Sequence, residues 1–192
     1  MATLEEVESA LGTLRQAGGD EIVLLHCVTN YPILDDEANL RVMDTLSRAF
    51  QVPVGFSDHT TGTVAPVAAV ARGACIIEKH FTLDRGLPGP DHAASLDPAS
   101  FKNMMDDIRA VEIILGSPEK KPLPVELENR RVMRRSIVAA VDLPAGTVLR
   151  PEHLALKRPG DGLDARSMES LLGRQLVRSM PKDEKLKPGD VK

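Results

Sequence analysis

Polar side chains of the kind that bind ligands follow three apolar runs of the sequence. They are His26, Thr29, Asn30 and Tyr31 after the first run, Ser57, Asp58 and His59 after the second, and Glu78 and His80 after the third. In parallel α/β folds, active sites form at the carboxyl ends of the strands. Two imidazoles with carboxylates nearby suit a divalent metal ion such as Mn²⁺ or Mg²⁺ with open coordination positions. The spacing therefore predicts one polar site in which His59 and His80 hold a metal.

The third run fixes which of its side chains share a face. Alternation along a strand places Ile76, Glu78 and His80 on one face and Lys79 on the other. If the first face lines a barrel interior, His80 lies at its mouth, where His59 from the neighbouring strand can reach the same point. Glu78 follows an apolar run and is predicted to be buried or to line the site, because burial of an unpaired carboxylate is costly.

Each of these residues also has an ordinary structural interpretation. A single histidine near a strand end is more often a hydrogen-bonded core or surface residue than a ligand. Asp58 could cap the following turn, Tyr31 could anchor a loop, and Asp91 and Arg158 would be turn residues on local sequence alone. Residue types and spacing leave these alternatives open.

The elements that position these residues alternate along the first 116 residues. Periodicity predicts helices over 3–17, 40–50, 65–72 and 97–115, and strands over 22–25, 52–56 and 75–80, the first of them buried on both faces. Thr3 with Glu6 has capping-box spacing, and Asp97-Pro98 is an N-cap and first-turn pair. Strands alternating with helices indicate a parallel sheet, which either a doubly wound fold or a (β/α)₈ barrel would contain.

The character of the sequence changes after residue 116. Residues 117–130 form a charged, proline-rich linker, beyond which no helical period is expected. In residues 131–192, Ser136–Val141 is a short β-like run. Leu143-Pro144-Ala145-Gly146 with Leu149, Pro151 and Leu154 repeats the spacing of Met180-Pro181-Lys182-Asp183 with Leu186, Pro188 and Val191. This echo predicts two similar turn units in one compact β-rich module.

Composition excludes several classes of function. The net charge of −4 argues against a general nucleic-acid surface. No apolar stretch approaches the roughly 20 residues of a membrane span. Cys27 and Cys75 adjoin apolar runs and are expected to be buried, reduced thiols, as in a cytoplasmic protein.

Five segments carry a resemblance to a known enzyme family. They are His26-Cys27-Val28-Thr29-Asn30-Tyr31-Pro32, Gly55-Phe56-Ser57-Asp58-His59-Thr60, Ile77-Glu78-Lys79-His80-Phe81-Thr82, Gly89-Pro90-Asp91-His92 and Lys157-Arg158-Pro159-Gly160. The first four resemble, in family order, the HCxxxYP, GxSDHT, xEKHFT and GPDH stretches of the N-acetylneuraminate (sialic acid) synthase family. The last resembles the KRPG turn of that family's antifreeze-like SAF domain. The resemblance implies the C-terminal part of a (β/α)₈ TIM barrel in residues 1–116 and a β-clip SAF domain in residues 131–192.

The resemblance also implies an activity and roles. The family condenses phosphoenolpyruvate with N-acetylmannosamine or a related amino sugar. Histidines matching His59 and His80 are catalytic and bind Mn²⁺ (or Mg²⁺), which polarises the open-chain sugar's aldehyde oxygen. Ser57 matches a position near the phosphate, and Tyr31 and Asp91 match positions that hold the sugar.

Two further implications concern neighbouring positions and partners. The family's asparagine beside the tyrosine matches either Thr29 or Asn30 here. Arg158 matches an arginine that the SAF domain inserts into the partner subunit's barrel to contact the N-acetyl group, which implies a homodimer.

A closed barrel takes about 250 residues, and only 116 precede the linker. We therefore expect an N-terminally truncated or split synthase that needs a complementary N-terminal half, because three strands alone leave an open edge. Two alternatives remain: a non-catalytic carbohydrate-binding or regulatory remnant of such an enzyme, and a small doubly wound α/β protein that is complete as it stands.

Overall fold

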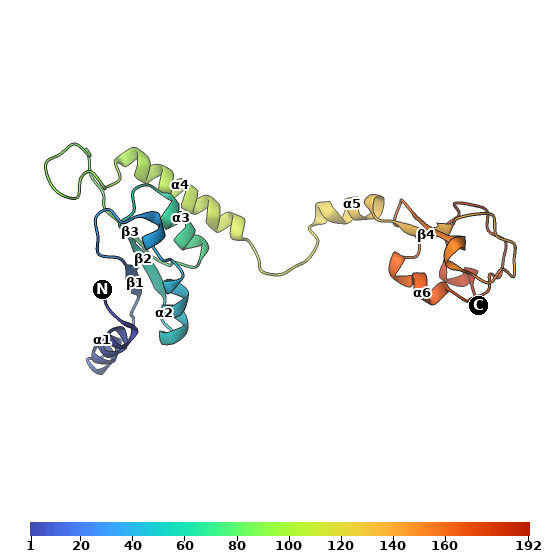
Figure 1. The fold of residues 1–192 in the computed structure, drawn as a ribbon, viewed down its shortest axis with the longest axis horizontal. Coiled ribbons are helices and arrows are strands. Elements are labelled where there is room, and N and C mark those ends of the chain that lie inside the picture. Colours follow the sequence, from blue (N-terminus) through green and yellow to red (C-terminus); the bar gives the residue numbers. More distant parts are fainter. The chain divides into compact units, whose positions relative to one another are not determined.

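The computed structural model describes all 192 residues, which form two compact units, Met1–Pro118 and Glu119–Lys192 (Figure 1). The N-terminal unit is an α/β segment around a parallel sheet. The C-terminal unit is small and rich in β-bridges and turns. The predicted fold class, part of an α/β barrel followed by a β-rich domain, is confirmed.

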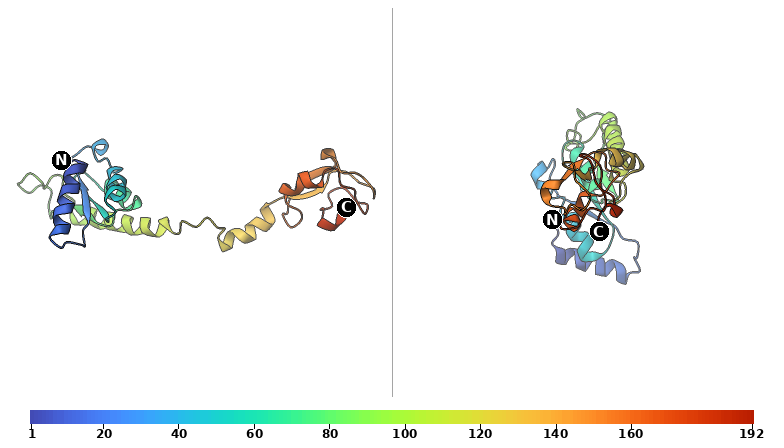
Figure 2. Two further views of the ribbon diagram at one scale, coloured as in Figure 1. Left: turned by 90° about the horizontal axis from the view of Figure 1, so that it is seen from below. Right: turned by 90° about the vertical axis from the view of Figure 1, so that its right-hand side faces the viewer.

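Three parallel strands in the order β1-β2-β3 make the sheet of the N-terminal unit. Figure 1 labels these strands, and Figure 2 shows the same ribbon from two further directions. The strands are β1 (Leu24–Cys27), β2 (Val54–Asp58) and β3 (Ile77–Lys79), and the helices are α1 (Leu4–Gln16), α2 (Val42–Phe50), α3 (Val64–Ala71) and α4 (Pro98–Leu115). A short 3₁₀ helix, η1 (Asp35–Glu37), precedes α2. The alternation agrees with the predicted order, but each strand begins two residues later than its apolar run.

Local signals start and stop these helices as predicted. The Thr3 amide donates to the Glu6 carboxylate over 2.7 Å and the Glu6 amide donates to the Thr3 hydroxyl over 3.3 Å, which completes the capping box. Asp97 accepts from the Ser100 amide over 2.7 Å at the start of α4. Gly116, with φ of 52°, follows its last residue. No helix combines the length and the apolar composition needed to cross a membrane.

Only one face of the sheet is covered. Met43 and Leu46 of α2 and Ala69 of α3 pack with Phe56 of β2 in a buried cluster. The opposite face exposes Leu25, so the expectation that the first strand is buried on both faces is wrong. No second layer of this chain packs over that side.

The two cysteine thiols are less buried than the sequence predicts. Cys75, expected to be buried, is exposed just before β3, and Cys27 is half-buried; both are free.

Gly55 shows how tightly the strands approach one another, because a Cβ there would lie 2.5 Å from the Ile76 carbonyl oxygen. The glycine of this motif is therefore required by packing.

The C-terminal unit begins with a helix that the sequence does not predict. α5 (Pro124–Met133) crosses the end of the expected linker, so the expectation that no helical period follows the linker is wrong. Pro124 stands at its first turn, and Glu126 accepts from the Leu123 amide over 2.7 Å. The neighbouring prolines and charges hide this start signal.

Beyond α5, the unit contains β4 (Ser136–Ala139) paired antiparallel with β5 (Leu154–Lys157), the helix α6 (Met168–Leu171), and the 3₁₀ helices η2 (Pro151–His153), η3 (Ala165–Ser167) and η4 (Pro188–Asp190). The predicted echo is visible in the backbone. Leu143 and Met180 exchange two hydrogen bonds of 2.8 Å. Gly146 and Asp183, at matching places, both have positive φ, 85° and 71°.

The two copies also make equivalent longer-range bonds. The Leu149 amide donates to Arg174 over 2.9 Å, and the Leu186 amide donates to Ile137 over 3.0 Å. Residues 149 and 186 match in the echo, and residues 137 and 174 differ by the same interval. The unit is thus built from two halves related by an approximate twofold axis, with both leucines in one core.

The central place of Leu186 generates a prediction. Its side chain is fully buried, whereas that of Val177 is 49 % exposed. In residues 119–192 produced alone, Leu186→Ala should lower the free energy of unfolding by about 2–5 kcal/mol. Val177→Ala should change it by no more than about 0.5 kcal/mol. Chemical denaturation monitored by circular dichroism measures both, and equal effects would contradict this assignment of the core.

Candidate functional site

The predicted site residues lie where the parallel strands end. His59 directly follows β2 and His80 directly follows β3, and Asp58 pairs with Lys79 in the register of these strands. The imidazole ring centres are 5.3 Å apart, with the ring planes at 78°. Parallel register therefore brings together two histidines that are 21 residues apart in the sequence.

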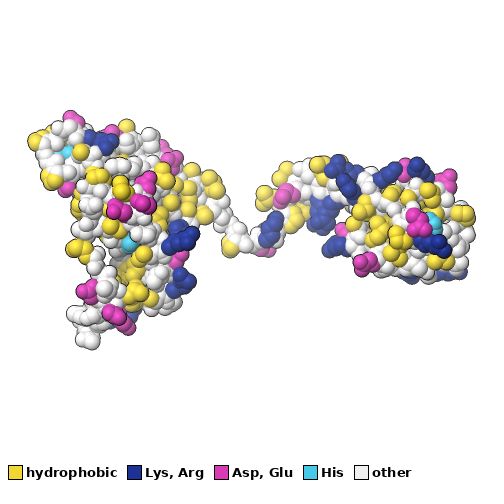
Figure 3. Space-filling view, viewed as in Figure 1, with side chains coloured by type: hydrophobic (Ala, Val, Ile, Leu, Met, Phe, Trp, Pro, Cys, Tyr) yellow, Lys and Arg dark blue, Asp and Glu magenta, His cyan; other side chains and the backbone are white.

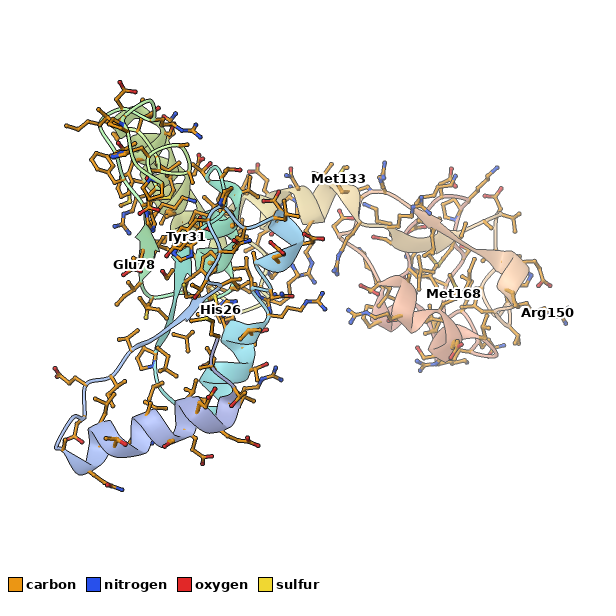
Figure 4. The ribbon with its side chains drawn as sticks, turned by 60° about the vertical axis from the view of Figure 1, so that its left-hand side comes forward. His26, Tyr31, Glu78, Met133, Arg150 and Met168 are labelled. Carbon is orange, nitrogen blue, oxygen red and sulfur yellow. The ribbon has the colours of Figure 1, made fainter.

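Tyr31 completes an aromatic group with the two histidines. Its ring centre lies 4.0 Å from that of His59 and 5.1 Å from that of His80. The Ile33 amide donates to the His59 carbonyl over 3.1 Å and holds the loop that carries the tyrosine. Figure 4 labels Tyr31 and Glu78, both in the N-terminal unit. The ring is 46 % exposed, so it forms an open wall of the site.

Both histidines have Nδ1 turned toward an oxygen acceptor. His59 Nδ1 donates to the Val28 carbonyl over 2.7 Å, and His80 Nδ1 lies 3.8 Å from a carboxylate oxygen of Asp91. The structure therefore brings the predicted Asp91 to the site. The hydrogen bond to Val28 leaves Nε2 of His59 as the nitrogen that can bind a metal, the tautomer that metal-binding histidines adopt. The Asp91 carboxylate is near His80 but beyond hydrogen-bond distance.

Ser57 and Glu78 lie below the histidines on the open face. The Ser57 hydroxyl donates to the Glu78 carboxylate over 2.5 Å, and the residues are paired in register. Glu78 is exposed, because no other layer covers this face. It lies on the face that the alternation predicts, but it is not buried.

The remaining predicted residues differ in their positions. Thr29 and Asn30 are both exposed, and no side-chain hydrogen bond joins either to the histidines. Arg158 belongs to the C-terminal unit. His26, grouped with the polar strand ends, lies on the covered face instead, where its Nε2 is 2.9 Å from the Ala38 carbonyl and its ring stacks on Phe56. His26 is therefore a core residue.

Arg158 closes the end of a helix. Its Nε donates to the Met133 carbonyl of α5 over 3.0 Å, and Figure 4 labels Met133 on that helix. A Cβ on Gly160 would lie 2.4 Å from Cβ of Arg134, so the turn that follows Arg158 is pressed against the same helix. The KRPG turn and the end of α5 thus form one surface.

Sequence reasoning missed two interactions near the site. Lys79 forms a buried ion pair with Asp58. His92 Nδ1 lies 2.7 Å from the Thr82 hydroxyl and ties down the loop that carries Asp91. All four residues belong to the motifs that carry the family resemblance, but only the three-dimensional structure reveals their pairing.

The two imidazoles fit a divalent metal ion bound through Nε2. A bond of about 2.1 Å to each nitrogen places two ring centres roughly 5 Å apart, and the observed separation is 5.3 Å. No group of three or more His, Cys, Asp or Glu side chains is placed to hold a metal. The fit within this chain is that of a two-histidine half-site beside the Tyr31 ring, and Cys27 Sγ lies 3.9 Å from Nε2 of His59.

A hollow elsewhere in this unit does not coincide with the histidines. It measures about 540 Å³ and lies at the amino ends of the strands, lined by Pro53, Val54 and Cys75 among others. In α/β barrels catalysis occurs at the opposite, carboxyl ends. We therefore locate the candidate site by the converging side chains.

Comparison with known families resolves the two fold alternatives. Residues 1–120 match the family model described as the NeuB family. This chain belongs to the NeuB family. Residues 134–192 match the SAF domain. A doubly wound α/β fold is thereby excluded.

Several curated relatives are named as synthases of legionaminic acid, pseudaminic acid or N-acetylneuraminate 9-phosphate. The chain is 47 % identical over 184 residues to the N,N'-diacetyllegionaminic acid synthase of Legionella pneumophila, covering 94 % of this chain and 52 % of that protein. It is 36 % identical over 162 residues to human N-acetylneuraminate-9-phosphate synthase, covering 83 % of this chain and 45 % of that protein. The chain thus spans about half the length of these relatives.

A solved structure agrees with this assignment. The N-acetylneuraminic acid synthetase of Leptospira borgpetersenii, in complex with citrate, is 36 % identical with a TM-score of 0.62. The superposition covers 67 % of this chain and 45 % of that one. The fold of about two thirds of this chain is therefore shared with a structure named as a sialic acid synthetase.

Tyr31 provides a direct test of metal binding at this site. It is the only tyrosine, and the chain has no tryptophan, so intrinsic emission reports on this ring alone. Cu²⁺, a paramagnetic probe, should quench this emission saturably. Quenching is expected because the ring centres of Tyr31 and His59 are 4.0 Å apart. His59→Ala should abolish the saturable phase, because it removes one of the two proposed metal ligands.

The matched control is His153→Ala in the C-terminal unit, which should leave the titration unchanged. Saturable quenching that persists at equal affinity in the His59→Ala chain would show that the probe binds elsewhere.

Proposed function

We propose that this chain forms the C-terminal part of a phosphoenolpyruvate-dependent nonulosonate synthase, with residues 1–116 as barrel, 117–130 as linker and 131–192 as SAF domain. The observation that carries the proposal is the convergence of His59, His80 and Tyr31 at the carboxyl ends of parallel strands. The substrates would be phosphoenolpyruvate and an open-chain N-acetylated amino sugar.

In this proposal His59 and His80 hold Mn²⁺ or Mg²⁺ through Nε2. When bound, the metal supplies Lewis-acid polarisation of the sugar's aldehyde oxygen. The Val28 carbonyl orients the His59 ring for this task through its hydrogen bond to Nδ1, and the Asp91 carboxylate lies 3.8 Å from Nδ1 of His80. The remaining ligand positions are left for substrate, water and groups from outside this chain.

The other side chains would position the reactants. Carbon 3 of phosphoenolpyruvate bonds to the aldehyde carbon, water adds at carbon 2, and phosphate leaves. Ser57, on the floor of the site, would lie near the phosphate. Tyr31 and Asp91, at the rim, would hold the sugar, together with Thr29 or Asn30. Orientation of this kind can supply about 7–11 kcal/mol of barrier reduction, so a partial site is expected to be inactive.

Arg158 would complete the site from a second copy of the chain. Its Nε caps α5, which leaves the terminal guanidinium nitrogens to donate to an N-acetyl carbonyl. The units carry opposite charge: residues 1–118 contain 17 acidic and 8 basic residues, net −9, and residues 119–192 contain 11 acidic and 16 basic residues, net +5. Figure 3 shows Lys and Arg side chains gathered along the C-terminal unit. Opposite charge favours docking of one unit on the other.

A mixed dimer tests Arg158 action in trans. The chain is extended by the N-terminal segment that its relatives carry, and an Arg158→Ala chain is mixed with a His59→Ala chain. Each homodimer should be inactive or strongly impaired. Random mixing should restore about a quarter of the wild-type sites, each with intact histidines and the partner's intact arginine.

Absence of recovery, with both variants dimeric, would exclude action in trans. Arg158→Ala alone should raise KM for the amino sugar about tenfold or more, because a charged hydrogen bond contributes about 1.5–3 kcal/mol. An unaffected KM would remove Arg158 from the site. Full activity of both homodimers would remove His59 as well as Arg158 from the site, whereas an inactive extended wild-type chain would favour a remnant with another function.

The opposite charges predict salt-sensitive docking. Raising ionic strength from about 0.1 M to 1 M shortens the Debye length from about 10 Å to 3 Å. The dimer dissociation constant, measured by sedimentation, should therefore rise at least tenfold. Reversal of charge at Arg130 and Arg131, both exposed, should weaken the dimer likewise, whereas reversal at Lys102 in the acidic unit should not. Salt-independent association would contradict an electrostatic contribution to docking.

A further inference from the structure

We propose that the buried ion pair between Asp58 and Lys79 is a positioning device that fixes the two site histidines relative to each other. Lys79 Nζ lies 2.6 Å from an oxygen of Asp58, and the side chains are 1 % and 0 % exposed. Each member immediately precedes a histidine, His59 or His80. The inference rests on the proposed metal role of those histidines.

The pair joins the ends of two neighbouring strands. Asp58 is the last residue of β2 and Lys79 the last of β3, and the two are directly opposite in register. The backbone bonds between β2 and β3 end there: the His59 carbonyl accepts instead from the Ile33 amide over 3.1 Å, and the His80 carbonyl from the Leu96 amide over 2.9 Å. These bonds tie each histidine to a different segment. The ion pair links the two histidine-bearing segments directly to each other.

The bonds of the pair continue past His59. The second oxygen of Asp58 accepts from the Thr60 amide over 2.8 Å, and Lys79 Nζ also donates to the Thr60 carbonyl. Asp58 and Lys79 thus both hold the backbone of Thr60, the residue that follows His59. The histidine is the middle residue of a turn that both charged groups close.

The pair itself lies away from the reacting groups. Ser57 and Glu78, one residue earlier on each strand, meet on the open face. By alternation Asp58 and Lys79 point to the opposite face, where the helices cover them. Neither side chain can touch a metal or substrate beside the imidazoles, so both are positioning residues.

Burial of two charges needs a reason beyond stability. Desolvation of a buried pair offsets much of its Coulomb attraction, and apolar pairs of similar size are often equally or more stable. An ammonium and a carboxylate with fixed partners do, however, define distance and direction more narrowly than apolar contacts. We therefore assign the pair to the geometry of the histidines.

The test separates geometry from stability with a volume-matched apolar pair. The full chain carrying Asp58→Leu and Lys79→Met should still fold, with an unfolding temperature only moderately lower than that of the wild type, because the Thr60 amide and carbonyl lose these partners. Its affinity for Mn²⁺, from the EPR signal of free Mn²⁺, should fall at least tenfold. Pulsed EPR of bound Cu²⁺ should count fewer coordinated imidazoles per ion than in the wild type.

The matched control removes the exposed pair Lys102–Asp106 on α4, which should leave affinity and imidazole count unchanged. Unchanged Mn²⁺ affinity and imidazole count in the apolar-pair variant would overturn the inference. If that variant does not fold, Lys79→Arg, which keeps the charge, is tested in its place. A change in Mn²⁺ affinity of threefold or more would support the inference. An unchanged affinity would overturn it.

His59→Ala distinguishes this inference from the proposed function. Metal binding that survives His59→Ala in the wild-type background would refute the proposed metal site. Loss of binding in His59→Ala, with retention in the ion-pair variants, would refute only the positioning role of Asp58 and Lys79.

Discussion

The parallel register of β2 and β3 is the constraint on which the candidate site depends. It places Asp58 opposite Lys79 and, one residue later, His59 beside His80. The strands have no control over the residues beyond their ends, so hydrogen bonds and ion pairs made there decide the side-chain geometry. The Val28 carbonyl, the Asp91 carboxylate and the buried ion pair all act on these two histidines. A shift of one residue in register would separate the imidazoles.

The two units differ in how completely they bury their apolar side chains. The C-terminal unit buries its leucines in one core formed by two equivalent halves, and each half closes the other through reciprocal backbone bonds such as those of Leu143 and Met180. The N-terminal unit covers only one face of its sheet and leaves Leu25 and Glu78 exposed on the other. This open face is the one that faces the interior in a closed barrel, which agrees with a chain that spans about half of its relatives.

Much of this organisation follows from sequence patterns. Helical periodicity and the Thr3 and Asp97 caps predict the helices, and the order of strands and helices predicts the parallel sheet. Each strand begins two residues after the start of its predicted apolar run, because apolar residues precede the first hydrogen-bonded pair. The helix α5 was missed because prolines precede it. The role of His26 could not be predicted, since alternation along a strand of uncertain start does not tell one face from the other. The pairing of Lys79 with Asp58 required the register itself.

The central claim is that His59 and His80 together form a metal half-site. The most direct measurement is anomalous diffraction at the manganese edge from crystals of the chain grown with Mn²⁺. The account predicts one strong peak within bonding distance of Nε2 of both histidines, under the ring of Tyr31. A peak bound to only one of these rings, or peaks only at surface carboxylates, would contradict it.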